Sequence, residues 1–549
     1  MYSEVRRKAD RLVTLCKPAL LDGRKIGLEK ESLRVSATGS ISQRDHPEAL
    51  GRALTHPNIT TDFSEALLEM VTPPCDSAAD AIDYLSAIHQ FIVTRLPAGE
   101  HIWNTSMPCI LRGGDSVRIG EYGESHSGKM KHAYRRGLGL RYGRRMQAIA
   151  GIHFNFSLPD SAWIARQQLS DAKPDVDYCD SHWQRLAPAE QQDLRTHGYF
   201  QTMQNLLRIG WVVPYLFGAS PAICASFLHE GEGEELAVLN DSTRYAPYGT
   251  SLRMGKIGYR YREDQPIDLS VRHTNIDAYI MDIAAHVSTE HLAYKDLGLL
   301  DEQGCFQQLS TSRLQIENEY YSSVRPKQIA RSGELPIHAL RERGIRYLEL
   351  RSVDVNLMQP NGLESDQVAM LEMLMLFAWL GDPQQLDADE LQACGQNLKT
   401  VAHCGRQPGL KLEGPDGEIG LREWGEQIVQ SLVPIAHWLD SDRGTLFYSN
   451  ALESQREKFA DAERTPSAIM LADVRQSGSF FEHAQMLSRQ HHDYFMNLPI
   501  DESIDKVLAD KVRESFVKQA NLEKDSHGSF EDFLAAYLNQ IHNEEFVNA

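Results

Sequence analysis

The sequence lacks the cysteine spacing of a zinc ribbon or of a disulfide framework. Its 549 residues include eight cysteines, and no two of them form a C-x-x-C pair. Cysteines scattered in this way are typical of a protein from a reducing compartment. The first 21 residues also lack the long apolar run of a signal peptide, because acidic and basic residues are interleaved there. Both absences predict a cytoplasmic protein.

A hydrophobic run regular enough to span a membrane is missing as well. The longest charge-free apolar run covers residues 210–228, and Pro214 and Pro221 interrupt it. A helix of minimal length that is broken twice is a poor membrane span. We therefore expect buried core strand and turn in this segment, and no membrane association.

Positive charge is in short supply. The chain has 56 Lys and Arg residues against 76 Asp and Glu residues, which gives a formal net charge of −20. This balance argues against nucleic acid or an anionic membrane as the main partner. It is compatible with small anionic substrates that arrive together with a metal ion.

The phosphate-binding motifs of common nucleotide enzymes are also absent. The chain contains no G-x-x-x-x-G-K-[ST] loop and no protein-kinase motif set. A nucleotide bound by this chain would therefore be held mainly through metal ions and isolated cationic side chains.

Hydrophobic patterning predicts a body of strands and loops up to about residue 360, followed by helices. No linker separates the two parts, so we expect one large catalytic unit over residues 1–549, with 1–360 as the catalytic body and 361–549 as a helical remainder packed on it. The segment 60–74 is predicted to be helical because Asp62 and Glu65 fit a capping box and two prolines end it. Helices are expected at 1–21, 60–74, 78–96, 161–209 and 273–296, and strands at 24–36, 151–159, 313–321 and 345–356.

The predicted strand 24–36 carries two acids at alternate positions. Side chains at i and i+2 of a strand face the same way, so Glu29 and Glu31 share a face with the apolar Leu33 and Val35. Two buried anions repel each other and are costly to desolvate unless they are paired. Either this face is the exposed side of an edge strand, or a divalent cation binds there, because hard cations take carboxylate oxygens.

Three further groups fit the same chemistry, and each also has an ordinary interpretation. Asp62, Glu65 and Glu69 would lie on one side of the expected helix 60–74. That side is either a second acidic cluster of the site or the solvated face of an amphipathic helix. His153 and Asn155 share a strand face, where a histidine is either a metal ligand or a core residue. On the strand 345–356, Tyr347, Glu349 and Arg351 share a face, and the last two form either an ion pair or a metal ligand beside a phosphate clamp.

A basic window precedes and includes the strand with His153. No Asp or Glu occurs from Ser125 to Pro159, whereas Lys and Arg crowd positions 129–145. The window is either a solvated basic helix or a site for carboxylate and phosphate oxygens. Carboxylates on strands, a strand histidine and nearby cations together favour metal-dependent phosphoryl transfer, as in a carboxylate–amine ligase.

Long segments of the chain resemble one family. These segments run in order from about residue 24 to 362, and the chain is closely similar through them to bacterial glutamate–cysteine ligases of the proteobacterial type. They include GLEKESLRV, ALTHPNITTDFSEALLEMVTP, YRRGLGLRYG, GIHFNFSLP, YGTSLRMGKIGY, LQIENEYYSSVRPK and LELRSVDVNLMQPNG.

The resemblance implies an α+β fold of the glutamine synthetase type. In that fold a curved, mainly antiparallel sheet holds a metal and ATP site on its concave side, and helices wrap it. The matching motifs imply that Glu29, His153 and Glu349 bind the ion nearest the ATP phosphates. They imply that Glu31, Asp62 and Glu69 bind the ions nearer the glutamate carboxylate. Two or three Mg²⁺ ions are expected, with Mn²⁺ as a substitute.

The resemblance also implies substrate contacts. Arg351 would contact the transferring phosphoryl group, and Arg253 would meet substrate or phosphate anions. Tyr134, Tyr259 and Tyr321 match the tyrosines that line the cysteine pocket. Arg135 and Gln147 lie in the matching region and are expected to bind substrate.

The implied activity is ATP-dependent ligation of the L-glutamate γ-carboxylate to the amine of L-cysteine through γ-glutamyl phosphate, the first step of glutathione biosynthesis. We expect a monomer or a small homo-oligomer. Two alternatives stay open: a related ligase that uses another acceptor amine, and a metal-stabilised scaffold or regulatory binder without turnover.

Overall fold

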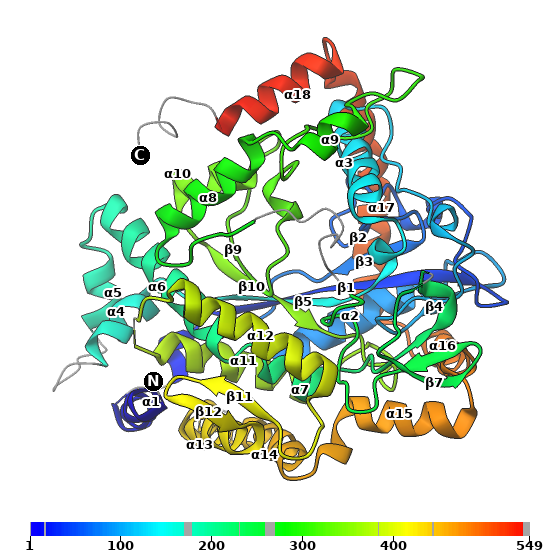
Figure 1. Cartoon of the computed structure of the whole chain (residues 1–549). Helices are drawn as coiled ribbons and strands as arrows, with labels where there is room; N and C mark the ends of the chain where they lie inside the picture. The colour runs from blue at the N-terminus through cyan, green and yellow to red at the C-terminus, as the bar shows by residue number, and fades with distance from the viewer. Residues whose placement is uncertain are drawn as a thin grey trace.

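A seven-stranded sheet lies at the centre of the protein, and helices cover it (Figure 1). The computed structural model describes residues 2–15, 18–169, 178–229, 231–258, 269–382, 384–441 and 444–541. Neighbouring strands of the sheet are all antiparallel. Their order is β2 (Ile59–Thr61), β3 (Leu67–Val71), β1 (Lys25–Ser36), β5 (Ile152–Ser157), β10 (Tyr347–Val353) and β9 (Val324–Lys327), and β4 (Glu100–Trp103) pairs with the end of β1.

The helices are spread along the whole chain and become dominant after residue 360. In the first part they are α1 (Tyr2–Leu15), α2 (Ala78–Val93), α3 (His126–Tyr142), α4 (Ser161–Gln168), α5 (Tyr178–Trp183), α6 (Pro188–Arg208), α7 (Val212–Phe217), α8 (Ile276–Ser288), α9 (Leu292–Leu297) and α10 (Pro336–Arg343). In the second part they are α11 (Ser365–Leu380), α12 (Ala388–Cys404), α13 (Leu421–Asp440), α14 (Phe447–Ala460), α15 (Pro466–Ser477), α16 (Phe480–Asn497), α17 (Glu502–Asp525) and α18 (Phe530–Leu538).

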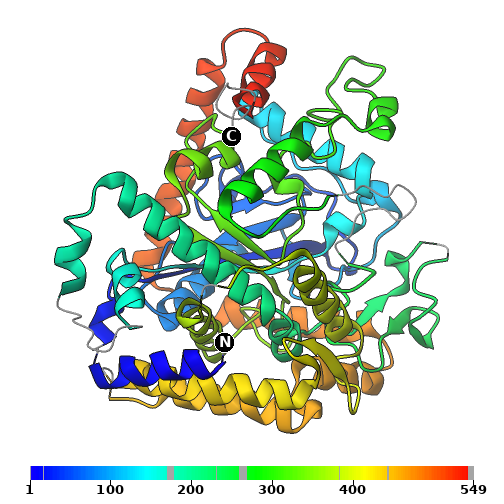
Figure 2. The same ribbon diagram turned by 60° about the vertical axis from the view of Figure 1, so that its left-hand side comes forward.

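Two small sheets lie outside the central one. Strands β6 (Ala222–Cys224), β7 (Ala237–Asn240) and β8 (Thr243–Tyr245) form a three-stranded sheet, and β11 (Lys411–Gly414) pairs with β12 (Gly417–Gly420). The N-terminal helix α1 packs along α13, more than 400 residues away in sequence (Figure 2). The first and last parts of the chain are therefore packed together.

The register of the central sheet decides which side chains meet. Glu29 of β1 lies opposite His153 of β5, and Glu31 lies opposite Glu69 of β3. Directly opposed residues of antiparallel strands project from the same face of the sheet. One face of the sheet therefore collects carboxylates and an imidazole from three neighbouring strands.

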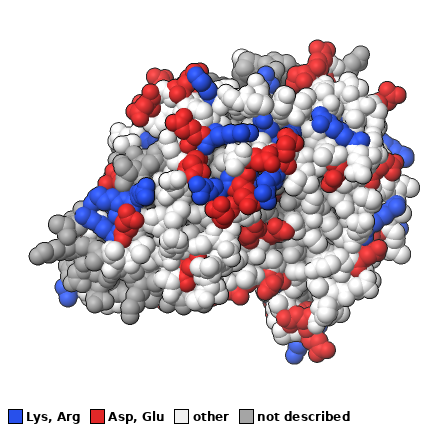
Figure 3. Space-filling view, turned by 90° about the horizontal axis from the view of Figure 1, so that it is seen from below, with Lys and Arg blue, Asp and Glu red and all other residues white. Residues whose placement is uncertain are grey.

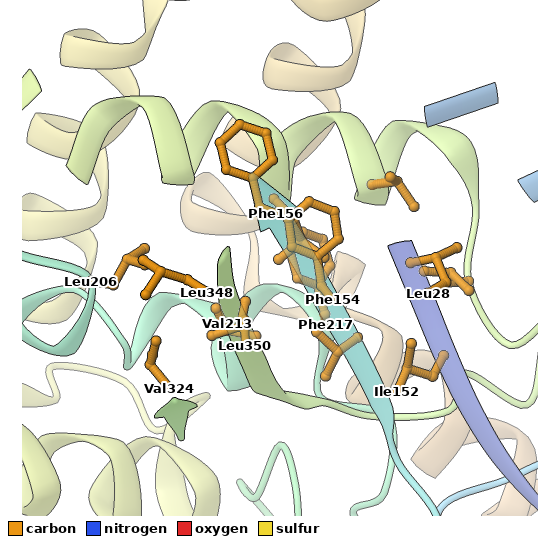
Figure 4. Close-up of a cluster of buried hydrophobic side chains, with 14 of the residues drawn as sticks. Leu28, Ile152, Phe154, Phe156, Leu206, Val213, Phe217, Val324, Leu348 and Leu350 are labelled. Atoms are coloured by element: carbon orange, nitrogen blue, oxygen red, sulfur yellow. The ribbon is translucent and has the colours of Figure 1, made fainter. Parts of the chain in front are cut away.

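The other face of the sheet is apolar. Phe154 and Phe156 of β5 and Leu348 and Leu350 of β10 point away from the carboxylates and pack against neighbouring helices (Figure 4). Helix α11 supports this layer, and every residue from 367 to 380 is buried. A helix that is buried on all sides belongs to a protein core, so the charged face rests on a rigid apolar base.

The predicted helix over 60–74 is wrong. The segment forms β2, a turn and β3, and the turn is closed by the Asp62 amide, which donates to the Leu67 carbonyl at 3.0 Å. Pairing of β3 with both β1 and β2 satisfies its backbone on two sides and buries Leu67 and Met70. These long-range contacts override the local helix signals, including the capping box.

Two other predictions also need correction. The predicted strand 313–321 contains a short 3₁₀ helix, Glu317–Glu319, within a loop. The segment 210–228 is buried as predicted, but it starts with helix α7 before β6. The strands at 24–36, 151–159 and 345–356 and the helices at 78–96 and 273–296 are confirmed, the last as α8 and α9. The predicted helix 161–209 appears as α4, α5 and α6, and residues 170–177 lie outside the described part.

The surface charge, the cysteines and the apolar character of the helices can be compared with the expectations from composition. On the face seen from below, basic and acidic side chains of the described residues are interspersed (Figure 3). The seven cysteines in the described ranges form no disulfide. Among the described helices, none combines the length and the apolar character that a membrane crossing requires.

Replacing Phe154 with alanine tests the apolar base of the sheet. Phe154 is fully buried, and removing a buried phenylalanine side chain costs about 3–5 kcal/mol. We expect F154A to unfold at a clearly lower urea concentration than the wild type. The control V238A removes an apolar side chain that is 63% exposed on β7 and should leave the midpoint unchanged; equal midpoints for both variants would contradict this packing.

Candidate active site

A cavity of about 660 Å³ opens on the charged face of the sheet. Its floor consists of side chains from β1, β3, β5, β10 and β9, and its walls come from α3, α12, the β2–β3 turn and the loop before β9. Twelve of the thirteen side chains that we expected at the site line it. They are Glu29, Glu31, Asp62, Glu69, Tyr134, Arg135, Gln147, His153, Arg253, Tyr321, Glu349 and Arg351.

His153 lies at the centre of the acidic cluster. Its Nδ1 is 3.1 Å from Glu29 Oε2 and 3.9 Å from Glu349 Oε1, and its Nε2 is 3.7 Å from Glu31 Oε1. Ligand atoms of Glu29, Glu69 and His153 lie within 4.8 Å of one another. Glu29 is also oriented by the Asn155 amide, which donates to its Oε1 at 2.8 Å. These groups converge on a small volume although they come from four strands, β1, β3, β5 and β10.

Electrostatics disfavours the ionised forms of Glu31 and Glu69 when no cation is bound. Burial, together with the nearby Asp62 carboxylate, raises the pKa of Glu31 to about 8, although Arg253 and Arg351 oppose the shift. Burial and the neighbouring carboxylates also raise the pKa of Glu69 well above its usual range. Buried carboxylates of like charge need positive charge nearby. Hard oxygen donors with one imidazole fit a divalent cation such as Mg²⁺ or Mn²⁺.

Asp62 and Glu65 take different positions from those that helical spacing predicted. Asp62 is at the β2–β3 turn and lines the cavity with Glu69. Glu65 faces away from the cavity, because its carboxylate accepts hydrogen bonds from the backbone amides of His46 and Glu121. The shared acidic helix face was therefore a wrong prediction, whereas Asp62 and Glu69 do meet in the cavity.

Cationic side chains lie beside the carboxylates. Arg351 Nη1 is 3.1 Å from Glu349 Oε2, and Lys327 Nζ is 3.4 Å from Glu349 Oε1. Arg253 donates from Nη2 to the Arg351 carbonyl at 2.7 Å. The two arginines are thus next to each other at the edge of the acidic cluster, as binding of an anionic group beside a metal ion requires.

Asp354 holds Arg253 in place and was missed from the sequence. Its carboxylate accepts hydrogen bonds from Ser220 Oγ at 2.6 Å and Ser251 Oγ at 2.9 Å, and it lies 3.7 Å from Arg253 Nη1. All four side chains are buried. Lys327 was missed too, although the strand sequence Arg325-Pro-Lys327 puts two cations at alternate positions, which is the spacing that revealed Glu29 and Glu31.

Aromatic side chains form another part of the cavity wall. Tyr134 comes from α3, and Tyr321 comes from the loop before β9. Gln147 Nε2 donates to Tyr321 Oη at 3.1 Å, so this amide orients the ring. Tyr259 lies outside the described residues. The wall combines aromatic surface with hydroxyl groups, which suits a small, partly apolar molecule.

A buried ion pair fixes the loop that carries Tyr321. Arg141 Nη1 is 3.1 Å from Glu319 Oε1, and both side chains are fully buried. The Arg141 guanidinium also lies 4.0 Å from the ring centroid of Tyr294 and donates to Gln308. The basic window thus serves partly as structure, because Arg141 is committed to this loop.

Known proteins agree with this geometry. An antiparallel sheet whose charged face presents carboxylates suited to a divalent cation and arginines suited to an anion fits the site of a metal-dependent ligase. The family model for glutamate–cysteine ligase matches residues 11–401. The chain is 40% identical to the glutamate–cysteine ligase of Azotobacter vinelandii over 94% of this chain and 95% of the relative, and 39% identical to that of Pseudomonas entomophila over 94% of each.

A solved structure gives the same result. The crystal structure of glutamate–cysteine ligase from Francisella tularensis in complex with AMP superposes with a TM-score of 0.85 at 33% identity, covering 94% of this chain and 98% of the other. The chain belongs to the glutamate–cysteine ligase family. The predicted family and fold class are thereby confirmed.

Replacing Glu29 or Glu349 with glutamine tests the acidic cluster. Glutamine keeps the shape of the side chain but removes the charge that a cation needs. We expect E29Q and E349Q each to lose at least about a hundredfold in kcat, equivalent to roughly 3 kcal/mol of transition-state stabilisation, as measured by ADP release at saturating substrates.

The matched control is E418Q on the β11–β12 hairpin, where the glutamate is exposed and pairs with Lys411. E418Q should keep full activity. Near-normal rates in E29Q or E349Q would contradict the catalytic role of the cluster. If the wild type shows no turnover and these variants lose thermal stability, the result would support the scaffold alternative.

Proposed function

We propose that the protein joins L-glutamate to L-cysteine at the expense of ATP, giving γ-glutamylcysteine, ADP and phosphate. The observation that carries this proposal is the convergence of Glu29, Glu31, Glu69, His153 and Glu349 on one cavity beside Arg253 and Arg351. Membership of the glutamate–cysteine ligase family supports the same reaction, and the relative bound to AMP supports a nucleotide substrate.

We assign the acidic cluster to two or three Mg²⁺ ions. Glu29, His153 and Glu349 would hold the ion nearest the ATP phosphates, and Glu31, Asp62 and Glu69 would hold the ions nearer the glutamate γ-carboxylate. When bound, these ions would offset the negative charge of the phosphate oxygens and of the carboxylate. Mn²⁺ offers the same oxygen chemistry and would substitute.

The first step activates glutamate. An oxygen of the γ-carboxylate bonds to the γ-phosphorus of ATP, the bond from that phosphorus to the bridging oxygen breaks, and ADP leaves with γ-glutamyl phosphate as the other product. Arg351 and Arg253 are positioned to bind the oxygens of the transferring phosphoryl group, where charge is concentrated in the transition state. Asp354 keeps Arg253 at this point through the contacts described above.

The second step forms the amide. The amine nitrogen of cysteine attacks the acyl carbon, the carbon–oxygen bond to phosphate breaks, phosphate leaves with the electron pair, and the amine releases a proton. Tyr134, Tyr259 and Tyr321 are assigned to the acceptor pocket, with Gln147 orienting Tyr321. The protein supplies no nucleophile of its own, so none of its cysteines needs to react. Burial of the cluster limits access of water to the acyl phosphate.

This reaction would be the first step of glutathione biosynthesis. Its partners are L-glutamate, L-cysteine, ATP and divalent metal ions, and the scattered free cysteines favour a cytoplasmic setting. We treat the chain as one catalytic unit that works as a monomer or a small homo-oligomer. A ligase with another acceptor amine is the alternative that the following experiment decides.

The test measures ADP release with ATP, Mg²⁺ and glutamate in the presence of cysteine, 2-aminobutyrate, alanine or ammonia. We expect cysteine to give the highest kcat/KM, 2-aminobutyrate to come next, and EDTA to abolish turnover. With glutamate labelled with ¹⁸O in the γ-carboxylate, one labelled oxygen should appear in the released phosphate, because that oxygen bonds to phosphorus in the first step.

Other outcomes would contradict parts of the proposal. Ammonia as the best acceptor would refute cysteine as the substrate while keeping the ligase chemistry. Unlabelled phosphate would refute the acyl phosphate. Full activity in EDTA would refute the assignment of metal ions to the acidic cluster.

A further inference from the structure

One face of α3 lines the active-site cavity. Lys131, Tyr134, Arg135 and Leu138 have the spacing i, i+3, i+4 and i+7, which puts them on the same side of a helix. All four line the cavity. Two cations therefore stand one helical turn or less from the tyrosine that we assign to the acceptor pocket.

Arg135 is largely occupied by the backbone. Its Nε donates to the Asp62 carbonyl, its Nη1 donates to the Lys131 carbonyl at 3.0 Å, and its Nη2 is 3.5 Å from the Thr61 carbonyl. Its guanidinium also lies 4.6 Å from the ring centroid of Tyr122. We therefore see Arg135 chiefly as the residue that holds the Asp62 turn against α3, rather than as the main contact to a substrate.

The Lys131 side chain, in contrast to that of Arg135, has few interactions among the described residues. Its ammonium lies over the Tyr122 ring, 5.4 Å from the centroid, and within the described ranges it forms no ion pair with a carboxylate. Burial, followed by the nearby Arg135, lowers the pKa of Lys131 to about 8, whereas the Glu69 and Asp62 carboxylates oppose the shift. An ammonium confined in a cavity is strongly stabilised by an anion that binds there.

The α-carboxylate of the acceptor amino acid is such an anion, and the proposed reaction would bring it to the part of the cavity beside Lys131. Its amine must reach the acyl carbon beside Asp62 and Glu69, and its side chain must reach Tyr134 and Tyr321. The carboxylate and the side chain diverge from the same carbon atom, so they need two anchors close together. Lys131 and Tyr134, about 5 Å apart along the helix axis, are anchors of this kind.

We propose that Lys131 binds the α-carboxylate of the acceptor amino acid and so selects α-amino acids over amines without a carboxylate. This inference depends on the proposed ligase function. It adds a specificity residue that the motif comparison did not single out, and it gives the enzyme a reason to reject ammonia. The γ-carboxylate of the donor glutamate is assigned to the ions held by Glu31, Asp62 and Glu69, and we expect donor binding not to involve Lys131.

The experiment compares two acceptors of the same shape, 2-aminobutyrate and its neutral amide 2-aminobutyramide, in the wild type, K131M, K131R and the control K129M. Lys129 belongs to the same helix but is exposed and pairs with Glu124. We expect K131M to raise the KM for 2-aminobutyrate roughly 10- to 100-fold, as loss of a hydrogen bond between charged groups predicts. K131R should recover part of this loss.

The other constants separate binding of the carboxylate from a general effect. In K131M the KM for glutamate and for ATP and the kcat/KM for 2-aminobutyramide should stay within about twofold of the wild type, and K129M should match the wild type throughout. A rise in the KM for glutamate alone would assign Lys131 to the donor and overturn the inference. Equal losses for both acceptors, or no change for either, would also overturn it.

A folding defect in K131M and a failure of the proposed function can each be distinguished from a failure of the Lys131 inference. If K131M does not fold, the comparison of K131R with the wild type decides, because only a carboxylate contact makes that substitution change the ratio of kcat/KM for the two acceptors; an unchanged ratio would overturn the inference. If the wild type releases no ADP with glutamate and any amine, the proposed function itself fails. If the wild type is active and K131M keeps the same acceptor preference as the wild type, only the role of Lys131 is refuted.

Discussion

The structure depends on one constraint: strand pairing brings several carboxylates together in a buried place. The register that pairs Glu29 with His153 and Glu31 with Glu69 cannot slip by one residue, because every side chain would then move to the opposite face. Desolvation by burial, followed by repulsion from neighbouring carboxylates, raises the pKa of Glu31 and Glu69. A cation bound to the ionised cluster would relieve both costs, so this register favours the proposed metal site.

The rest of the molecule maintains this arrangement from both sides. Phe154 and its neighbours on the reverse face pack on the buried helix α11, so the charged strands have little freedom to move apart. In front of the sheet, Asp354 fixes Arg253, and the Arg141–Glu319 ion pair fixes the loop with Tyr321. Catalysis by phosphoryl transfer consists mostly of positioning and charge stabilisation. For the proposed reaction, rigid support of a few ionised groups would therefore be the main contribution of the chain.

The sequence predicted the parts of this site that depend on the alternation of side chains along single strands. Alternation along 24–36, 151–159 and 345–356 placed Glu29, Glu31, His153 and Glu349 on strand faces, and the structure contains those strands. Asp62 and Glu69 were assigned to a helix, because a short amphipathic segment with a capping box fits both periods until its partner strands are known. Their place in the site came from family resemblance. Asp354 and the Arg141–Glu319 pair were missed because their roles arise only from contacts distant in sequence.

The central claim is that these acids form a common metal site. The most direct measurement is an anomalous difference map from a crystal soaked with Mn²⁺ and ADP. The account predicts two or three anomalous peaks inside the cavity, each bounded by oxygen atoms of the acidic cluster, with His153 beside one of them. Peaks only at other positions, or an ordered nucleotide whose phosphates lie in a cluster without any bound metal, would contradict it.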